Sequence, residues 1–170
     1  TILKNVTVHA KKGQTVAIVG PTGAGKTTII NLLMRFYDPQ GGEIILDEKV
    51  VTIRSPQDAQ NVGISTVYQE ITLCPNLTVA ENMYIGRTKG IGTNWKKMNA
   101  DAGKLLETLG IPASPQQQLG TCSIAVQQMV AIARAVDMDC KVLILDEPTS
   151  SLDEQEVAKL FKLMLDLKAK

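Results

Sequence analysis

Alternating apolar and polar positions predict a series of short β-strands along the chain. The alternating ranges are 2–10, 15–19, 43–46, 49–53 and 64–68. A continuous apolar run at 141–145 predicts one further, more deeply buried strand. Because helix-like stretches separate these ranges, the pattern favours an α/β fold.

Helix signals lie between the strands, where capping residues precede runs with apolar residues three or four positions apart. The predicted helices are 26 to the break at Asp38-Pro39, 55–61 with Ser55 as cap, 78–84 with a capping box at Thr78 and Glu81, 99–109 with Asn99 as cap, 123–136 with Ser123 as cap, and a last helix opened by 151–153. On the last helix we expect one face to pack in the core, formed by Val157, Leu160, Phe161, Met164 and Leu167. The stretch 87–95 is expected to be a mobile loop.

The segment between the strand at 15–19 and the helix at 26 matches the phosphate-loop pattern G-x-x-x-x-G-K-[ST]. It reads Gly20-Pro21-Thr22-Gly23-Ala24-Gly25-Lys26-Thr27-Thr28. Glycines allow backbone N–H groups to surround an anion, and the helix N-terminus adds partial positive charge. Lys26 can reach the outer phosphates of a nucleotide and the Thr27 hydroxyl can bind Mg²⁺. The alternative is a glycine-rich turn with an incidental lysine, which the flanking strand and helix disfavour.

Three polar residues follow predicted strands and are candidates for the reaction of a bound nucleotide. Asp146 ends the apolar strand, where a carboxylate can hold Mg²⁺. Glu147 can orient or deprotonate a water aligned with the γ-phosphate. Gln69 leaves another strand, and its amide can contact the metal or the water. Taken singly, each is also compatible with an ordinary polar turn residue.

Composition limits the other classes of function. The chain has 170 residues, 44% of them hydrophobic, and 18 Lys and Arg against 17 Asp and Glu. A net charge of +1 disfavours nucleic acid or an anionic membrane as partner. The three cysteines are widely spaced and suggest neither a zinc site nor a disulfide framework. The sequence has no membrane-length apolar run and no leader pattern, which indicates a soluble piece of a larger system.

Four segments together resemble the ATP-binding domain of ABC transporters, and the resemblance covers essentially the whole chain. They are 20–28, 68–70, 127–135 and 143–153. The stretch from Ile53 onward looks most like the sugar-importer branch, whereas Thr1 to about Leu46 looks more like the exporter branch.

The resemblance implies a P-loop core with a β subdomain (1–74 and 137–170) and an inserted helical subdomain (75–136), truncated at the C-terminus. It implies ATP and Mg²⁺ as cofactors. A second ATP-binding domain would close over the nucleotide, and a transmembrane permease would hold the chain at the cytoplasmic face of the cell membrane. Residues 150–153 would meet the second domain, and Ser123 would contact that domain's nucleotide.

The chain departs from the family pattern at three places. The family's Leu-Ser-Gly-Gly-Gln signature is Cys122-Ser123-Ile124-Ala125-Val126 here, so side chains crowd the approach of a partner's nucleotide, Ile124 in particular. The chain ends before the strand that carries the family's switch histidine, and His9 cannot replace it. It also begins after the family's adenine-stacking aromatic residue. We therefore expect phosphate binding to be retained and turnover of residues 1–170 to be close to background.

The favoured function is ATP binding and hydrolysis that energises import of a small solute, with a sugar favoured. One alternative is an ATP-binding module or engineered fragment with little hydrolysis. Another is a soluble ABC-type ATPase that acts on nucleic acid or ribosomes, which the neutral charge disfavours. A small-molecule kinase would leave 122–135 and 146–153 unexplained.

Overall fold

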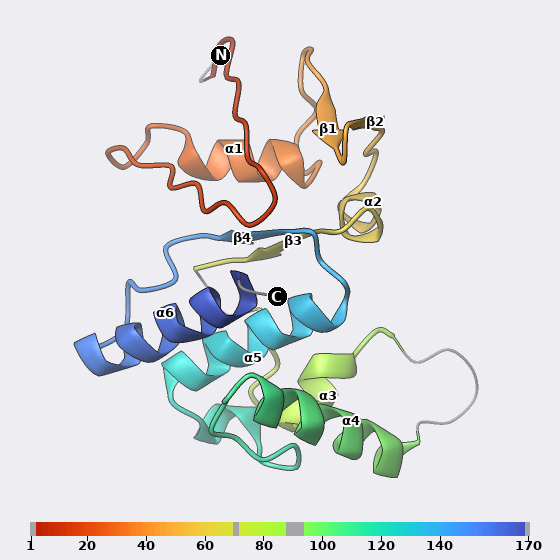
Figure 1. Ribbon diagram of the computed structural model, residues 1–170, viewed down its shortest axis with the longest axis vertical. Coiled ribbons are helices and arrows are strands. Elements are labelled where there is room, and N and C mark those ends of the chain that lie inside the picture. Colours follow the sequence, from red (N-terminus) through yellow and green to blue (C-terminus); the bar gives the residue numbers. More distant parts are fainter. Residues whose placement is uncertain (1–2, 70–71, 88–93, 169–170) are drawn as a thin grey trace.

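The computed structural model describes residues 3–69, 72–87 and 94–168 (Figure 1). The elements in chain order are α1 (Lys26–Leu33), β1 (Ile44–Leu46), β2 (Lys49–Val51), α2 (Pro56–Asn61), β3 (Ile64–Val67), α3 (Val79–Tyr84), α4 (Trp95–Thr108), a 3-10 turn η1 (Leu119–Thr121), α5 (Ile124–Asp137), β4 (Val142–Leu145) and α6 (Glu154–Lys168). The mixture of helices and strands agrees with the predicted α/β class.

The parallel pair β3–β4 forms the central layer of the molecule. Its register pairs Ile64 with Val142 and Val67 with Leu145. One face contacts α1 through a cluster that includes Ile30 and Met34. The other face contributes to a larger core that includes residues of α3, α4, α5 and α6. Figure 1 shows α1 on one side of the two strands and α5 and α6 on the other. This layering follows from strands that carry apolar residues on both faces.

An antiparallel hairpin, β1–β2, lies beside α1 and is linked to the central layer by one ion pair. Its turn residues Asp47 and Glu48 both have positive φ, at 50° and 63°. The Asp47 carboxylate accepts from the Lys141 ammonium, directly before β4, at 2.6 Å. This bond lowers the pKa of Asp47, and Lys12 and Lys49 add smaller effects in the same direction. The hairpin and its turn at 47–48 are thus as predicted, whereas the link to Lys141 is not visible in the sequence.

Most predicted helix caps are confirmed. Ser55, Thr78 and Ser123 each accept a hydrogen bond from a backbone N–H in the first turn of their helix, and the Thr78–Glu81 capping box is complete. The predicted start of α4 at Asn99 is wrong, because Asn94 caps the helix by accepting from the Lys97 N–H at 3.0 Å. Residues 88–93 of the expected mobile loop lie outside the described residues.

The predicted strands at 2–10 and 15–19 are a clear difference from the structure, since none of the described residues 3–19 belongs to a strand. Val16 and Ile18 are 42% and 43% exposed, and Val19 is 88% exposed. An alternating pattern specifies which residues would share a strand face, but a strand also needs a neighbour for its backbone hydrogen bonds. No such neighbour lies beside this segment in the part of the chain that the structure describes.

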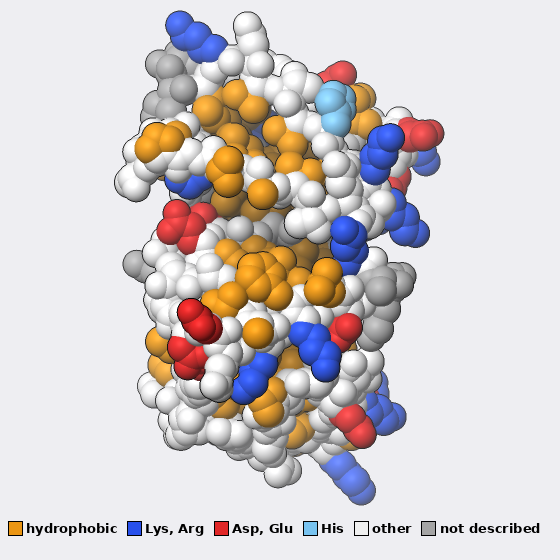
Figure 2. Space-filling model, turned by 60° about the vertical axis from the view of Figure 1, so that its left-hand side comes forward, with side chains coloured by type: hydrophobic (Ala, Val, Ile, Leu, Met, Phe, Trp, Pro, Cys, Tyr) orange, Lys and Arg blue, Asp and Glu red, His pale blue; other side chains and the backbone are white. Residues whose placement is uncertain are grey.

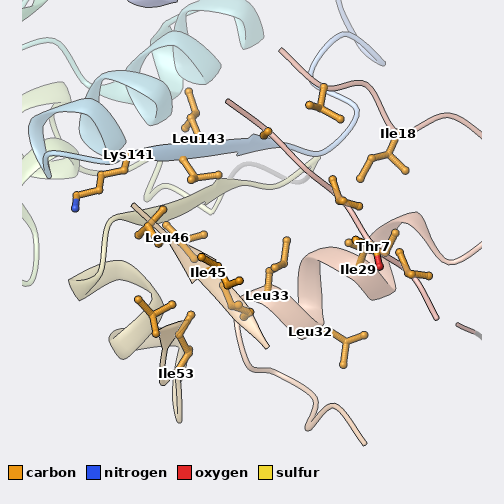
Figure 3. A pocket seen from close by; sticks show the side chains of 18 of the residues that line it. Thr7, Ile18, Ile29, Leu32, Leu33, Ile45, Leu46, Ile53, Lys141 and Leu143 are labelled. Carbon is orange, nitrogen blue, oxygen red and sulfur yellow. The ribbon is translucent and has the colours of Figure 1, made fainter. Parts of the chain in front are cut away.

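A cleft of about 3000 Å³ is lined by the N-terminal segment, α1 and the hairpin on one side and by β4 and α6 on the other. Figure 2 shows hydrophobic side chains gathered in the hollow between these two parts. Figure 3 shows that Ile18, Leu33, Ile45 and Leu143 line it from four different segments. The lining includes Thr28, the last residue of the phosphate loop, but none of residues 20–27, so most of the loop lies outside the cleft.

The last helix packs on the core with a slightly different face from the predicted one. Leu160 and Leu163 are buried, at 0% and 3% exposure, whereas Phe161 is 48% exposed. The prediction for Phe161 is therefore wrong, because the buried residues of this helix are Leu160 and Leu163, with Met164 and Leu167 partly buried against the same core. None of the described helices is both long enough and apolar enough to cross a membrane.

Candidate functional site

The phosphate loop lies at the start of α1 and has the backbone that such a loop requires. Gly23 and Gly25 have φ of 83° and 92°, a region that side-chain-bearing residues rarely adopt. Gly25 is the N-cap of α1 and provides no side-chain acceptor, so the first N–H groups of the helix have no side-chain cap. Uncapped N–H groups at a helix start favour binding of an anion.

The Lys26 ammonium is folded back onto its own loop. It donates to the carbonyl oxygens of Gly20 at 2.8 Å and Pro21 at 3.2 Å. Both acceptors are neutral carbonyls, and a charged phosphate oxygen is a stronger acceptor for an ammonium. Lys26 is thus held over the loop, where it can exchange these carbonyls for phosphate.

The two candidate residues beyond β3 and β4 come to one edge of the central layer. Val67 and Leu145 are paired at the carboxyl ends of the two strands, and the Asp146 N–H donates to the Val67 carbonyl at 3.0 Å. Gln69 follows Val67 by two residues and is exposed. Figure 1 shows this edge and the phosphate loop on the same side of the molecule.

The alternation along β4 places Asp146 on the face that carries α1. Ile144 packs with the α1 cluster, whereas Leu143 and Leu145 pack on the opposite side. Asp146 follows Ile144 by two residues and therefore continues the α1 face. It is partly buried, as suits a carboxylate beside a phosphate loop.

The backbone turns sharply at Glu147. Its φ is 46°, and its carbonyl accepts from the Ser150 N–H at 3.2 Å. A non-glycine residue in this region is strained, and such strain is often found at functional sites. The turn ends the strand and leaves Glu147 exposed, so its carboxylate is accessible to water.

Tyr68 is a neighbour of the site that sequence reasoning does not identify. It packs with the α1 cluster, and its ring meets Phe36 edge to face at 6.4 Å between centroids. Burial raises the pKa of the Tyr68 phenol, and the negative charge of Asp146 adds to that effect. Its position two residues after Thr66 and four after Ile64 on the same strand face is the signal that could have placed it near α1.

Ser123 is not part of this cluster of residues. It caps α5 in the helical part of the chain, where its hydroxyl accepts from the Val126 N–H at 3.4 Å. Ile124 is 46% exposed, whereas Ala125 is 2% exposed and packs inward. Of the two residues that replace the family's glycines, only Ile124 therefore has a side chain at the surface, and its crowding of a partner's nucleotide stays a prediction.

The candidate residues provide oxygen atoms suited to a hard cation. The Asp146 carboxylate and the Thr27 hydroxyl are the kind of ligands that Mg²⁺ accepts, with phosphate oxygens and water completing its shell. Within the described ranges no group of three or more His, Cys, Asp or Glu side chains forms a ready-made metal site. This donor set fits a metal that binds together with a nucleotide.

The fold and the phosphate loop define a P-loop nucleotide-binding domain. Residues 3–150 match the ABC transporter family model. The chain belongs to the ABC transporter family of ATP-binding domains.

Several relatives are import proteins from bacteria. The chain is 39% identical to the ribose import ATP-binding protein RbsA of Corynebacterium glutamicum, over 99% of this chain and 33% of that protein. It is 46% identical to the fructose import ATP-binding protein FruK of Bifidobacterium longum, over 95% of this chain and 32% of that protein. It is 44% identical to the galactofuranose transporter ATP-binding protein YtfR of Escherichia coli, over 98% of this chain and 34% of that protein. The chain thus spans about a third of the length of these relatives.

Solved structures support the same fold. A nucleotide-free ATP-binding cassette from an ABC transporter superposes with a TM-score of 0.85 at 27% identity, over 99% of this chain and 71% of that chain. The ATP-binding cassette MJ0796, in a dimeric post-hydrolysis state bound to ADP and Pi, superposes with a TM-score of 0.78 at 28% identity. The match covers 98% of this chain and 75% of that chain. The predicted P-loop fold class is confirmed, whereas the subdomain boundaries at 75 and 136 stay predictions.

Proposed function

We propose that the phosphate loop binds ATP together with Mg²⁺. Residues 20–28 surround the phosphates, Lys26 pairs with the outer ones, and Thr27 and Asp146 are ligands of the metal. The observation that carries this proposal is the position of Lys26 at the uncapped start of α1, with Asp146 on the face of β4 toward α1. Mg²⁺, when bound, neutralises charge on the phosphate oxygens.

The chain's own residues can then direct water to the γ-phosphate. Glu147 is accessible at the turn after Asp146 and acts as the group that orients the water and accepts its proton. Gln69 leaves the neighbouring strand at the same edge and holds the water or the metal through its amide. Lys26 stabilises negative charge on the phosphate during transfer.

The hydrolysis energises import of a sugar. RbsA, FruK and YtfR are named for ribose, fructose and galactofuranose, and all three match nearly the whole chain. The full protein therefore works with a transmembrane permease at the cytoplasmic face of the cell membrane. A second ATP-binding domain closes over the nucleotide, with Ser123 presented to that domain's phosphate. The dimeric state of MJ0796 is the relevant solved precedent.

Phosphate release by the full protein tests the hydrolysis. Glu147→Gln keeps the size of the side chain and removes its basicity, so turnover should fall by about 10²–10⁴, the usual contribution of a general base. Glu154→Gln, at an exposed acid on α6, is the matched control and should leave turnover unchanged. Equal turnover in Glu147→Gln and the control would contradict the role of Glu147, whereas no turnover by the unmodified full protein would leave the binding module without hydrolysis as the better function.

Sugar uptake tests the transport step. Cells that lack the gene for the full protein should lose uptake of at least one of ribose, fructose or a galactose-type sugar, and Lys26→Ala should fail to restore it. Uptake of all three at the level of unmodified cells would contradict the sugar import proposal while leaving ATP binding untouched.

A further inference from the structure

Asp146 and Glu147 are adjacent in the chain, and the proposed hydrolysis uses both carboxylates at one nucleotide. Successive side chains of a strand point to opposite faces of the sheet. Asp146 continues the α1 face through Ile144, whereas Leu145 packs on the opposite face. If β4 continued as a regular strand, Glu147 would therefore follow Leu145 onto that opposite face, away from the helix that the phosphate loop begins.

The left-handed backbone of Glu147 interrupts this alternation. Its φ is 46°, whereas the strand ends at Leu145. A residue in this conformation does not continue the pleat of the strand, so its side chain need not follow the alternation. Glu147 is exposed, while Leu145 is partly buried. The strained residue thus keeps the carboxylate in contact with water.

Pro148 occupies the second position of the turn that begins at Glu147. The Ser150 N–H donates to the Glu147 carbonyl at 3.2 Å and closes the turn. The proline ring fixes φ near −65°, which is the value that this turn position requires. Proline also disfavours the right-handed helical conformation at the residue before it. Pro148 therefore both sets the turn and removes one of the relaxed conformations that Glu147 could adopt.

The chain is held on both sides of this turn. Before it, the Asp146 N–H donates to the Val67 carbonyl of β3 at 3.0 Å. After it, the Leu152 N–H donates to the Thr149 carbonyl at 3.3 Å, and the Leu152 side chain packs against the same core as Leu145. Because both flanks are fixed, the backbone at residue 147 cannot relax by moving its neighbours alone.

We propose that Pro148 is a positioning residue for the hydrolysis, because its turn holds Glu147 in the left-handed conformation and so lets two successive carboxylates serve one nucleotide. The proposal rests on the proposed function, in which Glu147 orients the water. The proline ring has no polar group, so Pro148 acts through the backbone of Glu147. The strain at Glu147 is then a cost to stability that the reaction uses.

Turnover by the full protein tests the role of Pro148. Pro148→Ala frees the turn, so turnover should fall by about tenfold or more, because a small misplacement of a catalytic group has a large effect on rate. Calorimetry should give an unchanged affinity for Mg-ATP. In a Glu147→Gln background the same substitution should change the residual single-turnover rate by less than about twofold, since the positioned group is gone. Pro56→Ala, at the start of α2, is the matched control and should leave turnover and affinity unchanged.

Thermal unfolding tests the backbone of Glu147 without any nucleotide. Glycine avoids the strain of a positive φ, so Glu147→Gly should melt about 1–4 °C above Glu147→Ala. Glu43 has an ordinary φ, and there the glycine variant should melt below the alanine variant.

Two results would overturn the positioning role of Pro148: unchanged turnover in Pro148→Ala, or an equal fall in both backgrounds. A Glu147→Gly variant that melts no higher than Glu147→Ala would overturn the strained backbone, and this pair decides the result if Pro148→Ala fails to fold by circular dichroism. Absence of ATP binding, or parental turnover in Glu147→Gln, would instead contradict the proposed function and the role of Pro148 with it, so the two failures are distinguishable.

Discussion

Lys26 is the residue whose charge is most directly used by the candidate site. Its ammonium contacts two carbonyls of its own loop, so the side chain is positioned before any ligand arrives. A group that is held in place loses little freedom on binding, and its interaction with phosphate is correspondingly favourable.

Lys26→Ala should weaken ATP binding by about 10- to 150-fold, since hydrogen bonds to charged groups contribute about 1.5–3 kcal/mol. Isothermal titration calorimetry measures the affinity directly. Lys162→Ala removes an exposed lysine from α6 and should leave the affinity unchanged. Equal affinities for all three proteins would contradict the role of Lys26.

Glu48 is a second residue whose surroundings give a clear expectation. Its φ of 63° is unfavourable for a side-chain-bearing residue by about 1–2 kcal/mol, and glycine avoids this strain. Glycine also has more freedom in the unfolded chain, which offsets about 0.5–1 kcal/mol of the gain. Glu48→Gly should therefore raise the melting temperature by about 1–4 °C. Glu43→Gly, before β1 at a position of ordinary φ, should lower it, and a lower value for Glu48→Gly would be inconsistent with the turn.

At the scale of the element, α3 shows how local chemistry fixes a short helix. The helix is only six residues long, and helices of that length are not stable alone. Glu81 accepts from the N–H and the hydroxyl of Thr78, both at 2.7 Å. These bonds define where α3 begins.

The capping box also predicts a pH dependence. The two bonds from Thr78 lower the pKa of Glu81 from its ordinary value of 4.5. The folded state therefore gains stability above pH 4.5 and loses it as the pH falls through the lowered pKa. Glu81→Gln keeps an acceptor but cannot titrate. The unfolding free energy of the variant should therefore be lower than that of the parent at pH 7, and the two values should converge at low pH. Urea unfolding from pH 7 to 3 measures this, with Glu107→Gln on α4 as control, and a constant difference would argue against the capping bonds.

At the scale of the whole molecule, we propose that the exposed start of α5 limits the approach of a second ATP-binding domain. Ile124 is 46% exposed beside Ser123. On this proposal, a branched side chain at this point keeps the helix N-terminus away from a partner's phosphate.

Ile124→Gly in a Glu147→Gln background should therefore promote ATP-dependent association, visible as an increase in mass by light scattering. Ala125 is left unchanged because it is buried and its removal would open a cavity in the core. Phe161→Ala removes an exposed apolar group of α6 and should not change association. No ATP-dependent increase for Ile124→Gly would show that another feature limits dimer formation.

The sequence by itself determined the phosphate loop, the hairpin, the caps at Ser55, Thr78 and Ser123, and the strands that deliver Gln69 and Asp146. These features depend on residues a few positions apart: a glycine for a left-handed backbone, a hydroxyl for the N–H groups that follow it, an apolar run for a buried strand. Such local interactions can be predicted from the sequence because the residues that make them are close together in the chain.

Only the tertiary structure decided which segments would find partners. The range 15–19 has the pattern of a strand, but no strand lies beside it among the described residues. Phe161 lies at the edge of an apolar helix face, and the core does not cover it. Asp47 with Lys141, and Arg87 with Asp137, are joined across 94 and 50 positions. Strand pairing and long-range ion pairs depend on groups brought together by the packing of the whole chain, and no local pattern records their distance in space.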